Sequence, residues 1–377
     1  MDLRSQLFAV KPVAVLLAEM EGDHRLRRVL GPVSLTALGV GAIIGAGIFV
    51  LTGLAAHDKA GPGLILSFVV AGIGCALAAL CYAEFASMVP VAGSAYTYAY
   101  ATLGELFAWI IGWDLVLEYP FLPFGWHGVM QGASYVFFAY IGFDSVSTHA
   151  EEARNPQRDV PIGIITSLAL CTVLYILVAA VLTGMVPYTE INIDAPVAGA
   201  FASRGLPVAV FFISLGAVVG ITSVLLVLLL SQARVLLAMA RDGLIPREFF
   251  AAVHPRFRTP HKGTILTGVL VAIVAALFPL RILAELVNIG TLMAFVIVCA
   301  AVWVMRRTNP QLPRPFRTPL VPYVPIAGMG MNFWLMYSLG WENWVRLVVW
   351  LLIGLLIYFF YGRKRSTMAL QRAAASR

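Results

Sequence analysis

The sequence predicts an all-α transmembrane protein of about ten helices, and two observations support this fold class. Of the 377 residues, 60% are hydrophobic and 12% are charged, whereas soluble domains carry roughly 25% charged residues. The charges are also clustered, and the runs between them exceed the about 20 apolar residues that a helix needs to cross a bilayer. Charge-free runs of this kind cover residues 29–57, 60–83, 161–189, 205–233 and 318–341.

Ten candidate spans follow from these runs. Each is expected to be a helix, because backbone polar groups in lipid need internal partners and the runs lack the alternation of a β-barrel. The spans cover residues 34–56, 62–86, 95–119, 126–147, 161–186, 206–238, 263–280, 283–305, 322–340 and 343–361.

Lysine and arginine gather in alternate loops, which predicts the orientation. Basic loops of a membrane protein face the cytoplasm, so both termini are predicted to be cytoplasmic in a plasma (inner) membrane. This orientation requires an even number of spans. The basic loops lie at residues 25–28, 154–158, 241–262, 306–317 and 363–365, and the alternate loops hold Lys59, Arg204, Arg281 and Arg346.

The span predicted at 95–119 has the weakest support, because it carries Glu105, Asp114 and Glu118 and is followed by two prolines. It could instead be a cytoplasmic amphipathic helix followed by a half-crossing. In that case every later basic loop would face outward, so the orientation rule favours a full crossing.

Several functional classes are excluded by the same patterns. The net charge of +7 does not indicate nucleic-acid binding, because the basic residues lie between apolar runs. The four cysteines also lie inside apolar runs, without a CxxC pair or His/Cys metal spacing, which is typical of small packing residues. We therefore expect no metal and no cofactor. The apolar stretch at 13–18 is too short for a signal peptide.

The first span contains four glycines within nine residues, in the run GVGAIIGAGIF. Glycine lowers helix stability by about 1 kcal/mol per position, so a break in the helix is one interpretation. The exposed N–H groups of the second half-helix could then hold a carboxylate. The other interpretation is close helix packing through small residues, which the spacing of Gly41 and Gly45 also fits.

The fourth span, FFAYIGFDSVSTHAEEARNP, places Gly142 and Asp144 within an apolar crossing. An ionisable residue there indicates function: Asp144 could face a water-filled cavity, or it could cap a broken helix. Asp114 and Glu118 share a helix face and could bind a cation or a proton. An intramembrane enzyme is a third hypothesis, although no nucleophile or metal motif lies near these carboxylates.

Seven segments together resemble the amino acid–polyamine–organocation superfamily, and specifically the bacterial relatives of cationic amino acid transporters. The resemblance covers nearly the whole chain. The segments are LLAEMEGDHRLRRVLGP, ALGVGAIIGAGIFVLTG, YAEFASMVPVAGSAYTYAYATLGE, GWDLVLEY, PFLPFGWHGV, VFFAYIGFDSVSTHAEEARNPQRDVPIGI and SQARVLLAMARDGLIP.

The resemblance implies two inverted five-helix repeats followed by two further helices. The expected division is a cytoplasmic segment at 1–33, an incomplete first repeat at 34–119, a second repeat at 120–305, two added spans at 306–361 and a cytoplasmic tail at 362–377. The substrate carboxylate would meet the amides of Ile44, Gly45, Ala46 and Gly47. Its ammonium would meet carbonyls around Phe138, Ala139 and Ile141, with Asp144 and Glu118 at acidic positions near the site.

The chain departs from the family after Tyr119, where it continues directly with PFLPFGWHGV. Part of the family's third helix and all of its fourth and fifth are missing, on the order of 80–100 residues at about 20 per crossing. The resemblance implies an amino acid permease, proton-coupled, with an amino acid as substrate and the bilayer as surroundings. The alternative is a deletion product that does not transport, or a membrane binding partner with the same ancestry.

Overall fold

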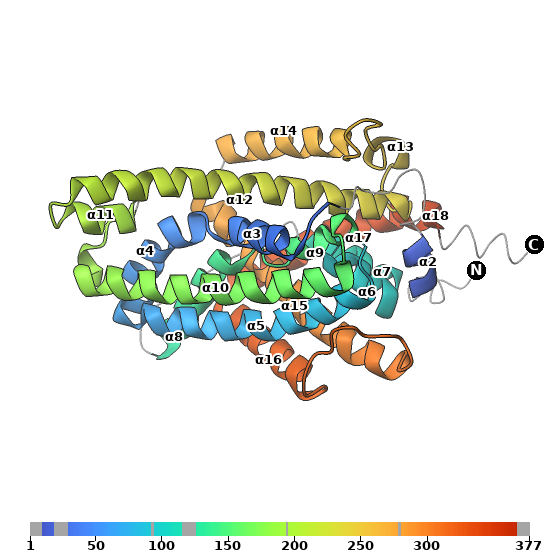
Figure 1. Cartoon of the computed structure of the whole chain (residues 1–377), viewed down its shortest axis with the longest axis horizontal. Coiled ribbons are helices and arrows are strands. Elements are labelled where there is room, and N and C mark those ends of the chain that lie inside the picture. The colour runs from blue at the N-terminus through green and yellow to red at the C-terminus, as the bar shows by residue number, and fades with distance from the viewer. Residues whose placement is uncertain are drawn as a thin grey trace, which may run out of the picture.

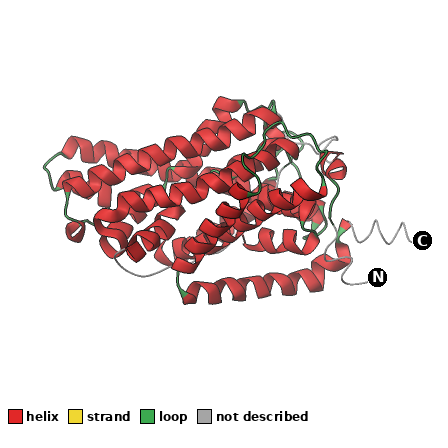
Figure 2. Cartoon of the chain, turned by 90° about the horizontal axis from the view of Figure 1, so that it is seen from below, coloured by secondary structure: helices red, strands yellow, loops and turns green. Residues whose placement is uncertain are grey.

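The computed structural model describes residues 10–18, 29–91, 94–114, 126–193, 195–277 and 280–367, and every regular element in these ranges is a helix (Figure 2). The prediction of an all-α transmembrane protein is thereby confirmed. Six helical segments are long and apolar enough to cross a bilayer. They cover residues 32–60, 64–88, 156–185, 207–241, 287–308 and 341–362, and the count of ten spans stays a prediction.

The helices follow the apolar runs of the sequence closely. The N-terminal part of the chain contributes α2 (Val13–Ala18), α3 (Pro32–Ile43), α4 (Thr52–Ala55), α5 (Leu64–Met88), α6 (Ser94–Thr102) and α7 (Glu105–Asp114). The middle contributes α8 (Trp126–Val136), α9 (Ser145–Thr148), α10 (Pro156–Met185), α11 (Pro196–Ala202) and α12 (Pro207–Arg241). The remainder forms α13 (Arg247–Phe250), α14 (His261–Leu277), α15 (Leu280–Thr308), α16 (Tyr323–Ser338), α17 (Trp341–Ile357) and α18 (Arg363–Arg365).

The long helices run side by side along the long axis of the molecule (Figure 1). α5 packs against α10, α8 and α16, and α3 packs against both α10 and α12. At one end of the bundle lie α2, α13 and α18 (Figure 1). We call it the basic end, because Arg241 ends α12 there and because α13 and α18 begin with Arg247 and Arg363. α11 lies at the opposite, remote end (Figure 1).

The N-terminal part of α12 and the whole of α14 contribute little to the core, whereas α12 is largely buried from Ser231 onward. None of residues 207–230 is buried, and in α14 only Gly263 and Thr267 are. Both helices are apolar, so their bare faces suit a lipid environment and could not be tolerated in water.

The expected single helix over 95–119 is wrong for the part that the structure describes. α6 ends at Thr102, and α7 begins at Glu105 after a turn in which Gly104 has a φ of +103°. At 1.5 Å per residue, neither helix of nine or ten residues could cross a core of about 30 Å alone. Glu118 lies outside the described residues, and the division into two repeats stays a prediction.

Candidate functional site

The first predicted span is broken where its glycines lie. α3 ends at Ile43, and Ile44 is extended, with φ −76° and ψ 92°. A π-helix then begins at Gly47 and continues to Leu51. Among the described residues, the amides of Gly45, Ala46 and Gly47 make no hydrogen bond outside a helical ladder. The second half-helix therefore begins with bare N–H groups.

The glycines of this span also pack closely, so both interpretations of the run hold. A Cβ at Gly45 would lie 2.6 Å from Cγ2 of Val224 in α12. A Cβ at Gly39 would lie 2.6 Å from Oγ of Ser167 in α10. Small residues thus let α3 approach two neighbouring helices as well as permitting the break.

The second break lies in the fourth predicted span. α8 ends at Val136, a 3₁₀ turn covers Phe137–Tyr140, and Ile141 turns the chain out of the helix with ψ 127°. Gly142 has a φ of +128°, a conformation that favours glycine, and a Cβ there would lie 2.5 Å from the carbonyl oxygen of Ala42. Position 142 therefore requires glycine for two reasons: the positive φ disfavours other residues, and α3 leaves no space for a Cβ.

Asp144 bonds the turn at this second break. Its Oδ1 accepts a hydrogen bond of 3.2 Å from the amide of Gly142, and α9 begins at the next residue. The side chain is half-buried. The carboxylate thus holds the turn before α9 and makes no side-chain hydrogen bond that caps α9 itself.

The two breaks touch each other. A Cβ on Gly47 would overlap the backbone of Ala139, and Gly142 lies against Ala42. The residues predicted around both breaks, 44–47 and 138–144, are thus brought together in the fold. In this conformation the main chain of one break closes directly on the other.

Tyr175 of α10 links the two breaks through a single hydroxyl. The hydroxyl lies 2.8 Å from the carbonyl oxygen of Ile43 and 3.0 Å from that of Ala139. Both carbonyls lie at the C-terminal ends of interrupted helices, where intrahelical partners are missing. A phenol has one proton, so it donates to one of these oxygens at a time. Tyr175 is buried, and sequence reasoning missed it because an isolated tyrosine in an apolar helix carries no local signal.

Two ion pairs tie the segment after the second break to α12 at the basic end. Arg234 lies 2.5 Å from Glu152, and Arg241 lies 2.8 Å from Glu151. All four side chains are largely shielded from solvent.

His149 lies at the same junction. Burial, and secondarily the nearby positive charge of Arg234, lower the pKa of His149 to about 3. Its Nδ1 is 2.9 Å from the carbonyl oxygen of Ser145. The imidazole is therefore neutral at physiological pH, with Nδ1 as the donor.

The profile of the family described as amino acid permease matches residues 30–122 and 114–370. The chain belongs to the amino acid permease family. Its members and the relatives below are transporters, not enzymes. The permease is 41% identical to the methylthioribose transporter of Bacillus subtilis (strain 168), over 97% of this chain and 99% of the relative.

Two further relatives are named for other transported substrates. The permease is 41% identical to the branched-chain amino acid permease BcaP of Bacillus subtilis (strain 168), over 97% of this chain and all of that protein. It is 29% identical to cationic amino acid transporter 4, vacuolar, of Arabidopsis thaliana, over 94% of this chain and 95% of the relative.

The relatives contain a stretch that this permease lacks. The alignment with the methylthioribose transporter is 460 residues long but includes only 97% of a 377-residue chain, which leaves on the order of 90 positions of the relative without a counterpart. The two family matches overlap at residues 114–122. This overlap contains Tyr119, where the sequence placed the junction.

Proposed function

We propose that this permease carries L-amino acids across the plasma (inner) membrane by proton-coupled alternating access, with both termini in the cytoplasm. The observation that carries the proposal is the meeting of two broken helices, one offering bare amides and the other offering carbonyls. Bare amides at a half-helix N-terminus suit a carboxylate, and freed carbonyls suit an ammonium group.

The proposed binding site uses the main chain. The carboxylate would accept from the amides of Gly45, Ala46 and Gly47. The amide of Ile44, which was predicted as a fourth donor, donates instead to the carbonyl of Val40 over 3.0 Å. The ammonium would donate to carbonyls in the stretch from Phe138 through Ala139 to Ile141. In this structure the Phe138 carbonyl accepts from the Ile141 amide and the Ala139 carbonyl lies 3.0 Å from the Tyr175 hydroxyl. Methylthioribose, the substrate in one relative's name, has neither charged group, so the paired amides and carbonyls favour a zwitterion.

The contact between Gly47 and Ala139 leaves no space for a substrate at that point. Binding therefore requires the two breaks to separate and Tyr175 to release the Ala139 carbonyl. The ion pairs of Glu151 and Glu152 with α12 hold the basic end together in this state. We infer that the structure corresponds to a closed state of the transport cycle.

Asp144 and Glu118 are the proposed carriers of charge and protons. An ionisable group within a membrane span is costly unless it is paired, wetted or functional. Asp144 is half-buried beside the second break. Protonation there would change the charge next to the proposed ammonium position.

Uptake into proteoliposomes tests the proposal. Labelled isoleucine, alanine, arginine, lysine and methylthioribose would each be offered with and without an inward proton gradient. We expect at least one amino acid to accumulate above empty liposomes, and a protonophore to abolish the gradient-driven part. Accumulation of none of the amino acids would refute the transport activity.

The shortfall of about 90 positions favours a second candidate, a membrane protein of this family that does not transport. Inserting the corresponding stretch of BcaP at residue 119 would distinguish the two. Transport only by the extended chain would establish the second candidate. Equal uptake by both chains would eliminate it.

A further inference from the structure

A groove lies beside the first break, between α10, α11 and α12. Its volume is about 400 Å³. The π-helical segment contributes Ile48 and Phe49, α10 contributes Leu177 and Val181, and α11 contributes Phe201. Leu174 and Leu182, which also line it, are eight residues apart, so the groove extends about 12 Å along α10 at 1.5 Å per residue.

We propose that this groove binds one acyl chain of an anionic phospholipid, whose headgroup phosphate lies at Arg204. The lining is apolar apart from the hydroxyl of Tyr175, and that hydroxyl is engaged with backbone carbonyls. A polar or zwitterionic ligand would leave its charges without partners there. The groove therefore fits a hydrocarbon chain.

The groove is continuous with surfaces at membrane depth. On α10, Leu177 and Val181 line the groove and are 56% and 47% exposed. On α12, Phe211 and Phe212 are more than 60% exposed close to Ile213 in the lining. A lipid chain can enter from the side, because these exposed residues join the groove to the surrounding hydrocarbon.

The groove suits an acyl chain better than a transmembrane helix. It extends about 12 Å along α10, whereas a helix that crosses the hydrocarbon core has to pack over about 30 Å.

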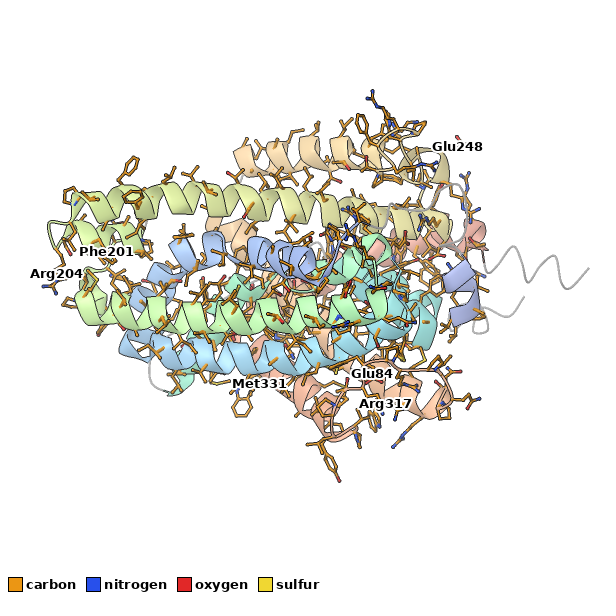
Figure 3. All side chains as sticks on the ribbon, viewed as in Figure 1. Glu84, Phe201, Arg204, Glu248, Arg317 and Met331 are labelled. Atoms are coloured by element: carbon orange, nitrogen blue, oxygen red, sulfur yellow. The ribbon has the colours of Figure 1, made fainter. Side chains whose placement is uncertain are left out.

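Arg204 supplies the charge for an anionic headgroup. It follows Phe201 of the lining by three residues, and its side chain donates to the carbonyl of Met185, where α10 ends. The residue is exposed, and among the ion pairs of the described residues none includes it. Figure 3 shows Phe201 and Arg204 next to each other at the remote end. The cation therefore lies at the mouth of the groove, where a headgroup would be.

Native mass spectrometry tests both the headgroup and the acyl-chain part of the proposal. The whole purified protein is titrated with a phosphatidylglycerol or with a phosphatidylcholine that has the same acyl chains. One basic residue near a headgroup contributes about a fivefold change in affinity. We expect Arg204→Gln to weaken phosphatidylglycerol binding about fivefold and to leave phosphatidylcholine unchanged. The matched control is Arg346→Gln, a partly exposed arginine on α17 that does not line the groove, which should change binding less than twofold.

The acyl-chain part is tested by filling the groove. Val181→Trp and Leu177→Trp should each reduce retention of both lipids at least tenfold, because the indole occupies the space of the chain. Val173→Trp is the control, since it is 57% exposed on the same helix but does not line the groove. Both groove positions are exposed enough to accept a larger side chain without refolding, and thermal unfolding would verify this for each variant.

Three results would overturn the proposal. Equal loss in Arg204→Gln and Arg346→Gln would show that no headgroup is recognised. Full lipid retention in both groove-filling variants would show that the acyl chain binds elsewhere on the protein. A polypeptide that co-purifies and is displaced by the tryptophans would identify a protein occupant instead.

Discussion

Gly47 and Ala139 are in direct backbone contact, with one residue from each of the two broken helices. The contact closes the space between the bare amides of the first break and the carbonyls of the second. It also makes position 47 intolerant of any side chain in this conformation. The fold and the proposed transport cycle therefore depend on the same glycine.

Replacing Gly47 with valine should destabilise this conformation. Extra volume in a packed interior costs about 1–3 kcal/mol, so we expect a lower melting temperature in detergent and loss of uptake. Gly216→Val is the control, because no heavy atom lies within 4 Å of a Cβ there. A melting temperature unchanged from the wild type would contradict the backbone contact.

Tyr175→Phe should increase substrate affinity while lowering stability. Removing the hydroxyl leaves the carbonyls of Ile43 and Ala139 without this donor, which costs about 1–3 kcal/mol of stability. The substrate ammonium would no longer compete with the phenol for Ala139, so KM should fall several-fold. Tyr140→Phe is the control, since that hydroxyl donates to the carbonyl of Phe68 in α5 and to neither Ile43 nor Ala139. A rise in KM would mean that Tyr175 contacts the substrate rather than competing with it.

The pair of Arg234 and Glu152 should be strongly coupled. Glu152→Leu leaves a largely buried guanidinium without its partner, which costs about 3–5 kcal/mol. The double variant with Arg234→Met removes both charges and should lose clearly less than the sum of the single variants. Chemical unfolding of all four proteins measures the coupling. Additive losses would show that the pair contributes nothing of its own.

His149 should make stability depend on pH in acid. Its folded pKa of about 3 lies below the usual 6.5, so the unfolded chain binds the proton more readily. The contribution of neutral His149 to the free energy of unfolding is complete above pH 6.5. It is lost as the pH falls towards 3, by up to about 1.4 kcal/mol per pH unit. The melting temperature of His149→Asn should therefore fall less than that of the wild type between pH 6.5 and 4.5. His254→Asn, on the loop between α13 and α14, should follow the wild type.

Both breaks carry a local signal in the sequence, although that signal left a break as one of two interpretations and only the family resemblance implied both. Clustered glycines weaken α3, and Gly142 beside Asp144 interrupts an apolar run. The fold class and the approximate extent of α10 and α12 were also predictable from apolar length, but α10 begins five residues earlier than expected, in a polar first turn at Pro156. Predicted spans at 161–186 and 206–238 compare with observed helices at 156–185 and 207–241.

The long-range contacts could not be predicted from the sequence. Tyr175 lies 132 residues from Ile43, and Arg234 lies 82 residues from Glu152. No sequence pattern near Tyr175 or Arg234 identifies its partner, because the pairing depends on how α10 and α12 pack. The turn at Gly104 was missed for the opposite reason: a single glycine in a helical run is usually tolerated, and only tertiary packing makes it a turn.

The hydrogen bond between Asp144 and the Gly142 amide couples charge to shape. Oδ1 cannot take up a proton and still serve as a full anionic acceptor for that amide. A proton arriving at this carboxyl group would weaken the turn that interrupts the helix, besides neutralising a charge. A proton that drives the transport cycle through Asp144 would thus also change the backbone conformation of this turn.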